Sequence, residues 1–154
     1  DYDTKGSIMP EHAIFVPALY THNATIDAQH KELIKRVNDL YDAIEKGGDA
    51  AGEKAKESLE FLTQYTVFHF QAEENLMKTT GYPLFTEHKK IHDAFVVTVR
   101  GLVDKLNELG PTPEFADLVE KEFTAWIINH IQGTDIKTIE WINNKGGDQM
   151  QNLL

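Results

Sequence analysis

The amino-acid sequence predicts an all-α protein, a single up-down-up-down antiparallel four-helix bundle. Apolar residues recur three and four positions apart over four long segments, which is the spacing of a helix that buries one face. Glycine and proline clusters separate these segments, and the sequence lacks the sustained alternation of apolar and polar residues that is typical of strands. Because the connections are short, successive helices are expected to lie antiparallel and adjacent.

Glycine and proline bound the first two predicted helices. The first begins within 23–27 and ends at Gly47-Gly48, and the second runs over about 50–78. Gly81 permits a left-handed cap after the second helix, and Pro83 cannot continue it. The predicted inward faces carry Leu33, Val37, Leu40, Tyr41 and Ile44 in the first helix and Leu59, Leu62, Thr66, Phe70 and Met77 in the second.

The third and fourth helices are predicted by the same signals. The third spans roughly 84–109. The fourth has Thr112 as its cap and Pro113 at its first position, and we expect it to end near 143–144, before Gly146-Gly147. The predicted inward faces carry Ile91, Phe95, Val99, Leu102, Val103 and Leu106 in the third helix and Phe115, Leu118, Val119, Phe123, Trp126 and Ile127 in the fourth.

These boundaries predict one helical domain over residues 15–144. Residues 1–14 are expected to form a polar N-terminal arm or leader, and residues 145–154 a C-terminal tail. A length of 154 residues is sufficient for one domain with a buried core. The first residue is not methionine, so we expect a processed chain or a piece of a longer protein.

The composition argues against several classes of function. A formal net charge of −10 would repel phosphate backbones and anionic lipid surfaces, so neither nucleic acid nor membrane partners are expected. The sequence has no apolar run long enough to cross a bilayer and no signal-peptide layout, which favours a cytoplasmic protein. It has no cysteine, so any metal must be held by imidazole and carboxylate groups.

Five of the seven histidines are placed so that every predicted helix offers at least one potential metal ligand. Pairs of ligands four residues apart on the second and third helices project from one helix face. Five imidazoles and two carboxylates exceed the needs of a single tetrahedral zinc ion, and they could serve two metal ions if the carboxylates are shared. The candidate ligands are, in helix order, His30; His69 and Glu73; His88 and His92; and His130 and Asp135.

Each of these signals is weak when taken alone. A single histidine on a helix is usually an ordinary half-exposed residue, and a pair such as His88 and His92 also arises by chance. The combination across four helices is what indicates a metal site. His12 and His22 precede the first helix without matching partners, so they are expected on the surface.

The spacing of His130 and Asp135 predicts a distortion of the fourth helix. Five residues turn a regular α-helix through about 140° beyond one full turn, so the two side chains would point apart. They can reach one site only if the helix contains a π-bulge or a similar irregularity. Such bulges are rare and often occur at functional sites.

At this level of detail the sequence resembles the hemerythrin family, including the bacterial hemerythrins. The resemblance covers roughly Phe15 to Trp141, and the expected residue type stands at all seven ligand positions of the family motif. It departs from the family in the N-terminal arm, where many members have a tryptophan near Phe15 and a glycine within 23–25. The matching segments are Ile26-Asp27-Ala28-Gln29-His30, His69 to Met77, Gly81-Tyr82-Pro83, His88 to His92, and Trp126 to Ile131 with Asp135.

The resemblance implies a non-heme di-iron centre. His88, His92 and His130 would complete one iron, and His30 and His69 would hold the other. Glu73 and Asp135, together with a solvent-derived oxo or hydroxo group, would bridge the two. Two octahedral ions with these ligands have one open position, which lies on the two-histidine iron and would bind dioxygen. Apolar residues should surround it, and we nominate Leu33, Phe70, Trp126, Ile127 and Ile131, which also suit ordinary core packing.

The predicted function is therefore reversible dioxygen binding without enzymatic activity. A di-iron oxidase or peroxidase is an alternative, although no glutamate precedes a histidine by three residues as in the carboxylate-bridged oxidases. A metal-storage bundle is another. The role is either that of a carrier or store, or that of a sensory module joined to a signalling domain in a longer chain. Both tails are longer than the bundle needs, which favours the sensory module.

Overall fold

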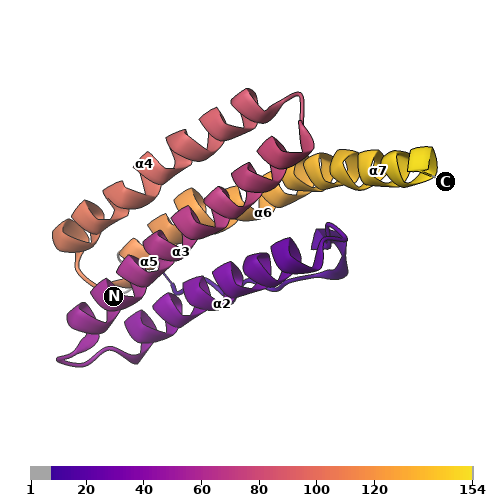
Figure 1. Ribbon diagram of the computed structural model, residues 1–154. Helices are drawn as coiled ribbons and strands as arrows, with labels where there is room; N and C mark the ends of the chain where they lie inside the picture. The colour runs from indigo at the N-terminus through magenta and orange to yellow at the C-terminus, as the bar shows by residue number, and fades with distance from the viewer. Residues whose placement is uncertain (1–7, 154) are drawn as a thin grey trace.

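The computed structural model describes residues 8–153, with side chains described for residues 8–144. Four helical rods lie side by side in an up-down-up-down arrangement, as predicted (Figure 1). Among the described residues there is no β-strand. The first three rods are α2 (Ala24–Lys46), α3 (Ala51–Thr80) and α4 (Phe85–Leu109); the fourth consists of α5 (Pro113–Val119), η2 (Glu120–Thr124), α6 (Ala125–His130), η3 (Ile131–Asp135) and α7 (Ile136–Leu153).

Several helices begin and end at the capping and terminating residues that the sequence predicts. The Asn23 side chain caps α2 by accepting a hydrogen bond from the backbone N–H of Ile26 at 2.9 Å. The Thr112 hydroxyl caps α5 in the same way, directly before Pro113. Gly81 ends α3 with a positive φ of 73°, a conformation that favours glycine.

The predicted inward faces form the core, with one exception. The stripes of α2 and α3 are buried, and α4 buries Phe95, Val99, Leu102 and Leu106. The prediction for Ile91 is wrong, because this side chain is 41% exposed. The buried face of α4 passes through His92 instead, and adjacent residues on an α-helix point about 100° apart.

The fourth rod contains two π-helical segments, η2 and η3. Its buried face repeats every four residues, and such a repeat drifts by about 40° per step on a regular α-helix. Each wider π-turn accommodates an extra residue, so the two segments together return the series to the core. The distortion predicted between His130 and Asp135 is confirmed as η3, whereas η2 was not predicted. The series is Phe115, Val119, Phe123, Ile127, Ile131, Asp135 and Ile139.

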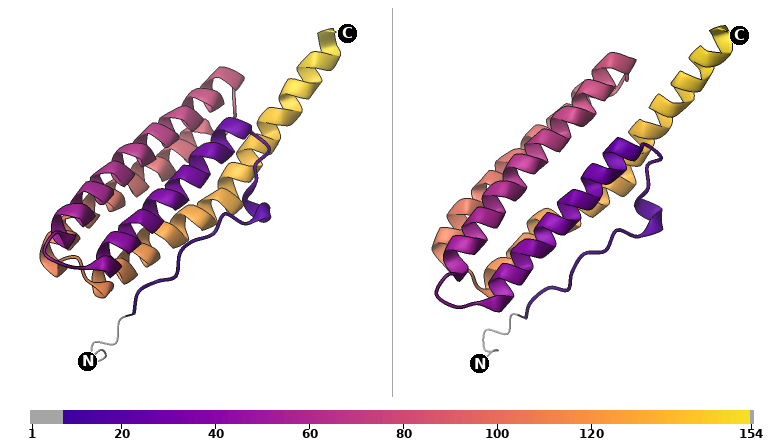
Figure 2. Two further views of the ribbon diagram at one scale, coloured as in Figure 1. Left: turned by 90° about the horizontal axis from the view of Figure 1, so that it is seen from below. Right: turned by 60° about the horizontal axis from the view of Figure 1, so that its bottom comes forward.

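The predicted end of the fourth helix is wrong. Helix α7 continues through Gly146-Gly147 to Leu153 and extends beyond the other three rods (Figure 2). A glycine inside a helix costs about 1 kcal/mol relative to alanine, which weakens a helix without necessarily ending it. Glycines terminate α2 because the chain reverses there with positive φ angles at Gly47 and Gly48.

The segment before α2 runs back along the outside of the bundle beside α2 (Figure 2). The backbone of Ala13 exchanges two hydrogen bonds with the Asn38 side chain, at 2.9 and 3.0 Å. After the short 3₁₀ helix η1 (Pro17–Leu19), the buried carboxylate of Asp27 accepts hydrogen bonds from the backbone N–H groups of Thr21 and His22. The segment therefore packs against the domain through Met9, Ala13 and Phe15, whereas Ile8 is exposed. Residues 1–7 of the predicted arm lie outside the described residues.

The two histidines of this segment are exposed, as predicted. The imidazole of His12 lies 2.6 Å from the Asp42 carboxylate at the surface, and His22 has an exposed side chain. Neither approaches the cluster of buried histidines. Over residues 8–153, no helix combines the length and the apolar character that crossing a bilayer requires.

Candidate metal centre

The structure brings all seven predicted ligands together in the middle of the bundle. Each of the four rods contributes at least one of them, and all seven are buried. They form two groups, within each of which the potential ligand atoms lie within 4.8 Å of one another. One group is Glu73, His88, His92, His130 and Asp135, and the other is His30, His69, Glu73 and Asp135.

Both carboxylates belong to both groups, and each presents one oxygen to either side. In the three-histidine group, Oε1 of Glu73 lies 3.1 Å from Nε2 of His92. Oδ1 of Asp135 lies 3.2 Å from Nε2 of His88 and 3.0 Å from Nε2 of His130. These oxygens belong to the three-histidine side.

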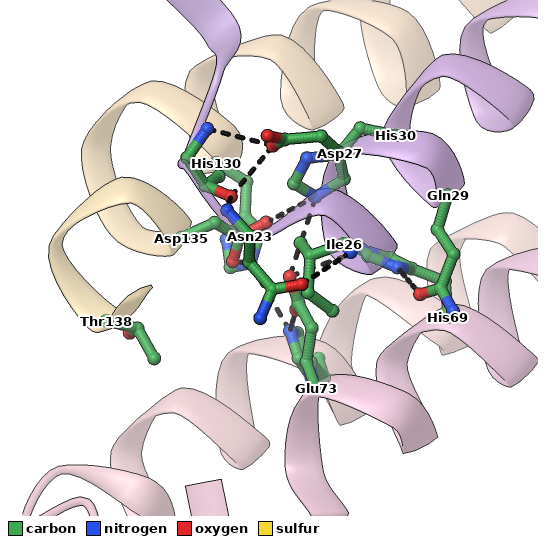
Figure 3. Close-up of polar contacts among 12 residues, drawn as sticks. Asn23, Ile26, Asp27, Gln29, His30, His69, Glu73, His130, Asp135 and Thr138 are labelled. Atoms are coloured by element: carbon green, nitrogen blue, oxygen red, sulfur yellow. Dashed lines mark hydrogen bonds and ion pairs between the residues drawn. The ribbon is translucent and has the colours of Figure 1, made fainter. Parts of the chain in front are cut away.

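The other oxygen of each carboxylate faces the two-histidine group. Oε2 of Glu73 lies 3.3 Å from Nε2 of His69. Oδ2 of Asp135 lies 3.0 Å from Nε2 of His30. Figure 3 shows His30 from α2, Glu73 from α3 and Asp135 from η3 pointing toward one another. Two carboxylates placed in this way can each bridge a pair of metal ions.

Polar side chains behind three of the imidazoles orient them. Nδ1 of His69 donates to the Oε1 atom of Gln29 at 2.7 Å (Figure 3). Nδ1 of His92 donates to Oε2 of Glu74 at 2.9 Å, and Nδ1 of His88 lies 3.0 Å from the Thr138 hydroxyl. The sequence pattern predicted no role for Gln29, Glu74 and Thr138. For the first two, the available signal was a polar residue directly beside a ligand in the chain.

The chemistry of these contacts fits bound cations. Gln29 Oε1 and Glu74 Oε2 accept from Nδ1, so a ring of His69 or His92 that carries one proton has a lone pair on Nε2. These lone pairs face the Glu73 oxygens, and among the described residues neither oxygen has a hydrogen-bond partner. A proton or a metal ion must lie between such buried atoms. The separations within each group suit a metal with ligands at about 2.0–2.2 Å.

A family comparison agrees with this arrangement. The family model described as the hemerythrin HHE cation binding domain matches residues 21–142, which include all seven side chains. The chain belongs to the hemerythrin family. Its bacteriohemerythrin relative from Pseudomonas aeruginosa is 30% identical over 133 residues, covering 86% of this chain and 83% of that protein.

Other hemerythrins show the same relationship. Myohemerythrin of Theromyzon tessulatum is 36% identical over 112 residues, which cover 73% of this chain and 78% of that protein. A crystal structure of a hemerythrin mutant superimposes with a TM-score of 0.69 at 28% identity. That match covers 84% of this chain and 96% of the other. The hemerythrin fold therefore accounts for nearly the whole described chain.

The five predicted pocket residues are divided between two places in this hemerythrin. The ring of Phe70 stacks on His92 with centroids 3.8 Å apart, and Trp126 stacks on His130 at 4.4 Å. These two aromatic residues cover ligands of the three-histidine group. Leu33, Ile127 and Ile131 are buried in the main hydrophobic core.

Leu33 and Ile127 also line a small cavity between α2 and α6. The cavity has a volume of about 180 Å³ and is too narrow to admit a water-sized sphere. Leu33 and Ile34 follow His30 by three and four residues, so they lie on the same side of α2 as this ligand. The cavity thus begins about one turn of α2 away from His30, and no metal ligand lines it. Its other lining residues are Val37, Phe123, Thr124 and Ile128.

The clustered groups shift one another's pKa values strongly. Burial by itself would lower the pKa of His30, but close contacts with Asp135 and Glu73 outweigh it and raise that pKa from 6.5 to about 9. Burial would raise the pKa of Glu73, but the charge of His69 and contacts with the other imidazoles hold it well below its usual range. Protons thus balance the carboxylates when no metal does, and a metal must displace them.

Proposed function

We propose that this hemerythrin binds two iron ions at the seven converging side chains and binds dioxygen reversibly at one of them. The observation that carries this proposal is the sharing of Glu73 and Asp135 by a three-histidine group and a two-histidine group. The three-histidine side has more protein ligands, so the open position falls on the side of His30 and His69. A pair of ferrous ions held by these residues would supply the electrons that bind dioxygen.

The protein's own residues orient the ligands and exclude water. Gln29 and Glu74 accept from Nδ1 and so hold His69 and His92 in the tautomer that presents Nε2 to the metal, while Thr138 orients the ring of His88. The apolar packing around Leu33 and Ile127 leaves a cavity too narrow for a water-sized sphere, which supports exclusion of water near the two-histidine side. Exclusion of water and anions from this space favours release of dioxygen over irreversible oxidation of the iron.

For the biological role we favour a cytoplasmic sensory module over a carrier or store. Helix α7 supports this choice, because it extends beyond the bundle in direct continuity with η3, which carries Asp135. A continuous helix offers a mechanical path from the metal centre to a neighbouring domain. A signalling domain would be the partner in a longer chain.

An oxidase or metal-storage function is the second candidate. The ligand set argues against an oxidase, because five imidazoles and only two carboxylates supply little negative charge to stabilise high-valent iron. Storage would require release of iron from a site whose seven ligands are all buried. Reversible binding agrees better with both observations.

An oxygen titration tests the proposed function. The protein is loaded with two equivalents of Fe²⁺ without air, and its visible absorption spectrum is followed as oxygen is added and removed. We expect a new band in oxygen that disappears under vacuum over several cycles, with one oxygen bound per iron pair. A spectrum that does not change, or that changes once without recovery, would contradict reversible binding.

Metal binding should also depend on pH in a defined direction. Because the pKa of His30 is raised to about 9, the ring is protonated at pH 7 and must lose a proton to bind a metal. The apparent Co²⁺ affinity is therefore expected to rise between pH 7 and 9, by up to about tenfold per unit for each proton displaced. Calorimetric titration in buffers of different ionisation enthalpy measures the released protons. Replacement of His30 by glutamine should reduce the slope, and a pH-independent affinity in this range would refute the assignment.

A further inference from the structure

The two sides of the metal centre differ in the side chains that accept hydrogen bonds from their histidines. Behind His69, on the two-histidine side, lies the neutral amide of Gln29. Behind His92, on the three-histidine side, lies the carboxylate of Glu74, whose Oε2 atom accepts the hydrogen bond at 2.9 Å. An anionic acceptor makes an imidazole more basic than a neutral one does, and it adds negative charge close to the metal.

Glu74 is partly shielded from solvent, so its negative charge can act on His92 and on the metal. Its side chain is only 14% exposed, so solvent screens its charge only in part. It lies at the edge of a hollow of about 350 Å³ between α3 and α4, which His92, Lys89 and Asp93 also line. Lys89 has its own partner there, since its Nζ atom lies 3.0 Å from the Asp93 carboxylate. Among the described residues, the Glu74 carboxylate accepts its hydrogen bond from His92.

We propose that Glu74 is a positioning residue that makes the three-histidine metal position the more electron-rich of the two. It holds His92 in the tautomer with the proton on Nδ1, and its charge stabilises the higher oxidation state of the metal beyond Nε2. The reduction potential of this metal is lowered as a result, whereas the neutral Gln29 leaves the opposite position without such a shift. This inference rests on the proposed metal centre and assigns different reduction potentials to its two metal positions.

The test compares two variants that each remove one negative charge from the same hollow. In Glu74→Gln the amide oxygen still accepts the hydrogen bond of His92, so the ring keeps its tautomer while the charge is lost. In Asp93→Asn the lost charge belongs to a residue that pairs with Lys89 rather than with a ligand. Both variants are loaded with iron, metal content is measured, and midpoint potentials are determined by spectroelectrochemistry.

We expect Glu74→Gln to retain two irons and to show a higher potential than the wild-type protein, while Asp93→Asn stays at the wild-type value. Glu74→Leu, which loses the hydrogen bond as well, should bind metal about 10–100-fold more weakly. An unchanged potential in Glu74→Gln, or an equal shift in both variants, would overturn the proposal. In the second case the effect is one of general surface charge.

A measurement without iron keeps this inference separate from the proposed function. In the Zn²⁺-loaded protein, the Nδ1 proton of His92 should resonate downfield of the corresponding proton of His69, because its acceptor is a carboxylate. The Glu74→Gln substitution should move the His92 resonance toward that of His69. Resonances that coincide in the wild-type protein would overturn the role of Glu74, whereas failure to bind an iron pair would defeat the proposed function alone.

Discussion

Replacement of Glu73 by alanine is expected to lower the bound iron from two ions per chain to one or fewer. Glu73 approaches His92 with one oxygen and His69 with the other, so its removal takes a ligand from both metal positions at once. Loss of a bridging carboxylate should cost each position well over tenfold in affinity, since even the groups behind metal ligands are worth about 10–100-fold. Metal analysis after equilibrium dialysis and the magnetic coupling of the remaining iron measure the result.

Two further variants separate the loss of the bridge from other effects. Glu73→Gln keeps the size of the side chain but can bind metal only through its carbonyl oxygen, so it should lose the coupled pair while the bundle stays folded. Glu60→Ala removes an exposed acid from the same helix and should bind two irons normally. Two coupled irons in both Glu73 variants would show that Glu73 does not bridge the metals.

Removal of the metal is expected to lower the thermal unfolding temperature by on the order of 10 °C. Metal that binds only the folded chain adds about 4 kcal/mol to the free energy of unfolding when its free concentration is a thousand times Kd. For a chain of this size each kcal/mol shifts the midpoint by about 2–4 °C. The metal also replaces the protons that otherwise balance two buried carboxylates. Calorimetry before and after chelation, and again after reloading with Co²⁺, measures the change.

Histidine variants supply the controls for this shift. His130→Ala removes a ligand that lies 3.0 Å from Asp135, so the metal should stabilise this variant much less. His12→Ala removes an exposed histidine that pairs with Asp42 at the surface, so its metal-dependent shift should equal that of the wild-type protein. Equal shifts in the two variants would indicate that the stabilising metal binds somewhere else.

Much of the site was predictable because it depends on spacing along single helices. The pair of His69 and Glu73 projects from one face at a separation of four residues, and this holds in any α-helical context. The same spacing explains why the buried stripes of α2 and α3 were predicted well. Ile91 was misplaced because periodicity gives no reason to prefer a histidine over an isoleucine on the buried face. Only the metal ligands on the other rods give His92 its place in the core.

The two π-helical segments could be predicted from the sequence to different extents. The separation of His130 and Asp135 predicted η3, because two ligands of one site must point the same way. The segment η2 follows from the same logic applied to apolar residues, since Phe115, Phe123 and Ile127 repeat at multiples of four. Recognition of that repeat required knowledge that all of these residues face one core.

The sequence by itself determined the four amphipathic helices, their order and the seven residues able to bind metal, because propensity, capping and side-chain spacing are local properties. The tertiary structure alone decided that each bridging carboxylate gives one oxygen to each side, and that Gln29 and Glu74 stand behind different ligands. It also placed Phe70 and Trp126 against ligands on the three-histidine side, and Leu33 and Ile127, but not Ile131, in the wall of the cavity. These features depend on the rotation and offset of one rod against the next, which arise only when the whole core packs.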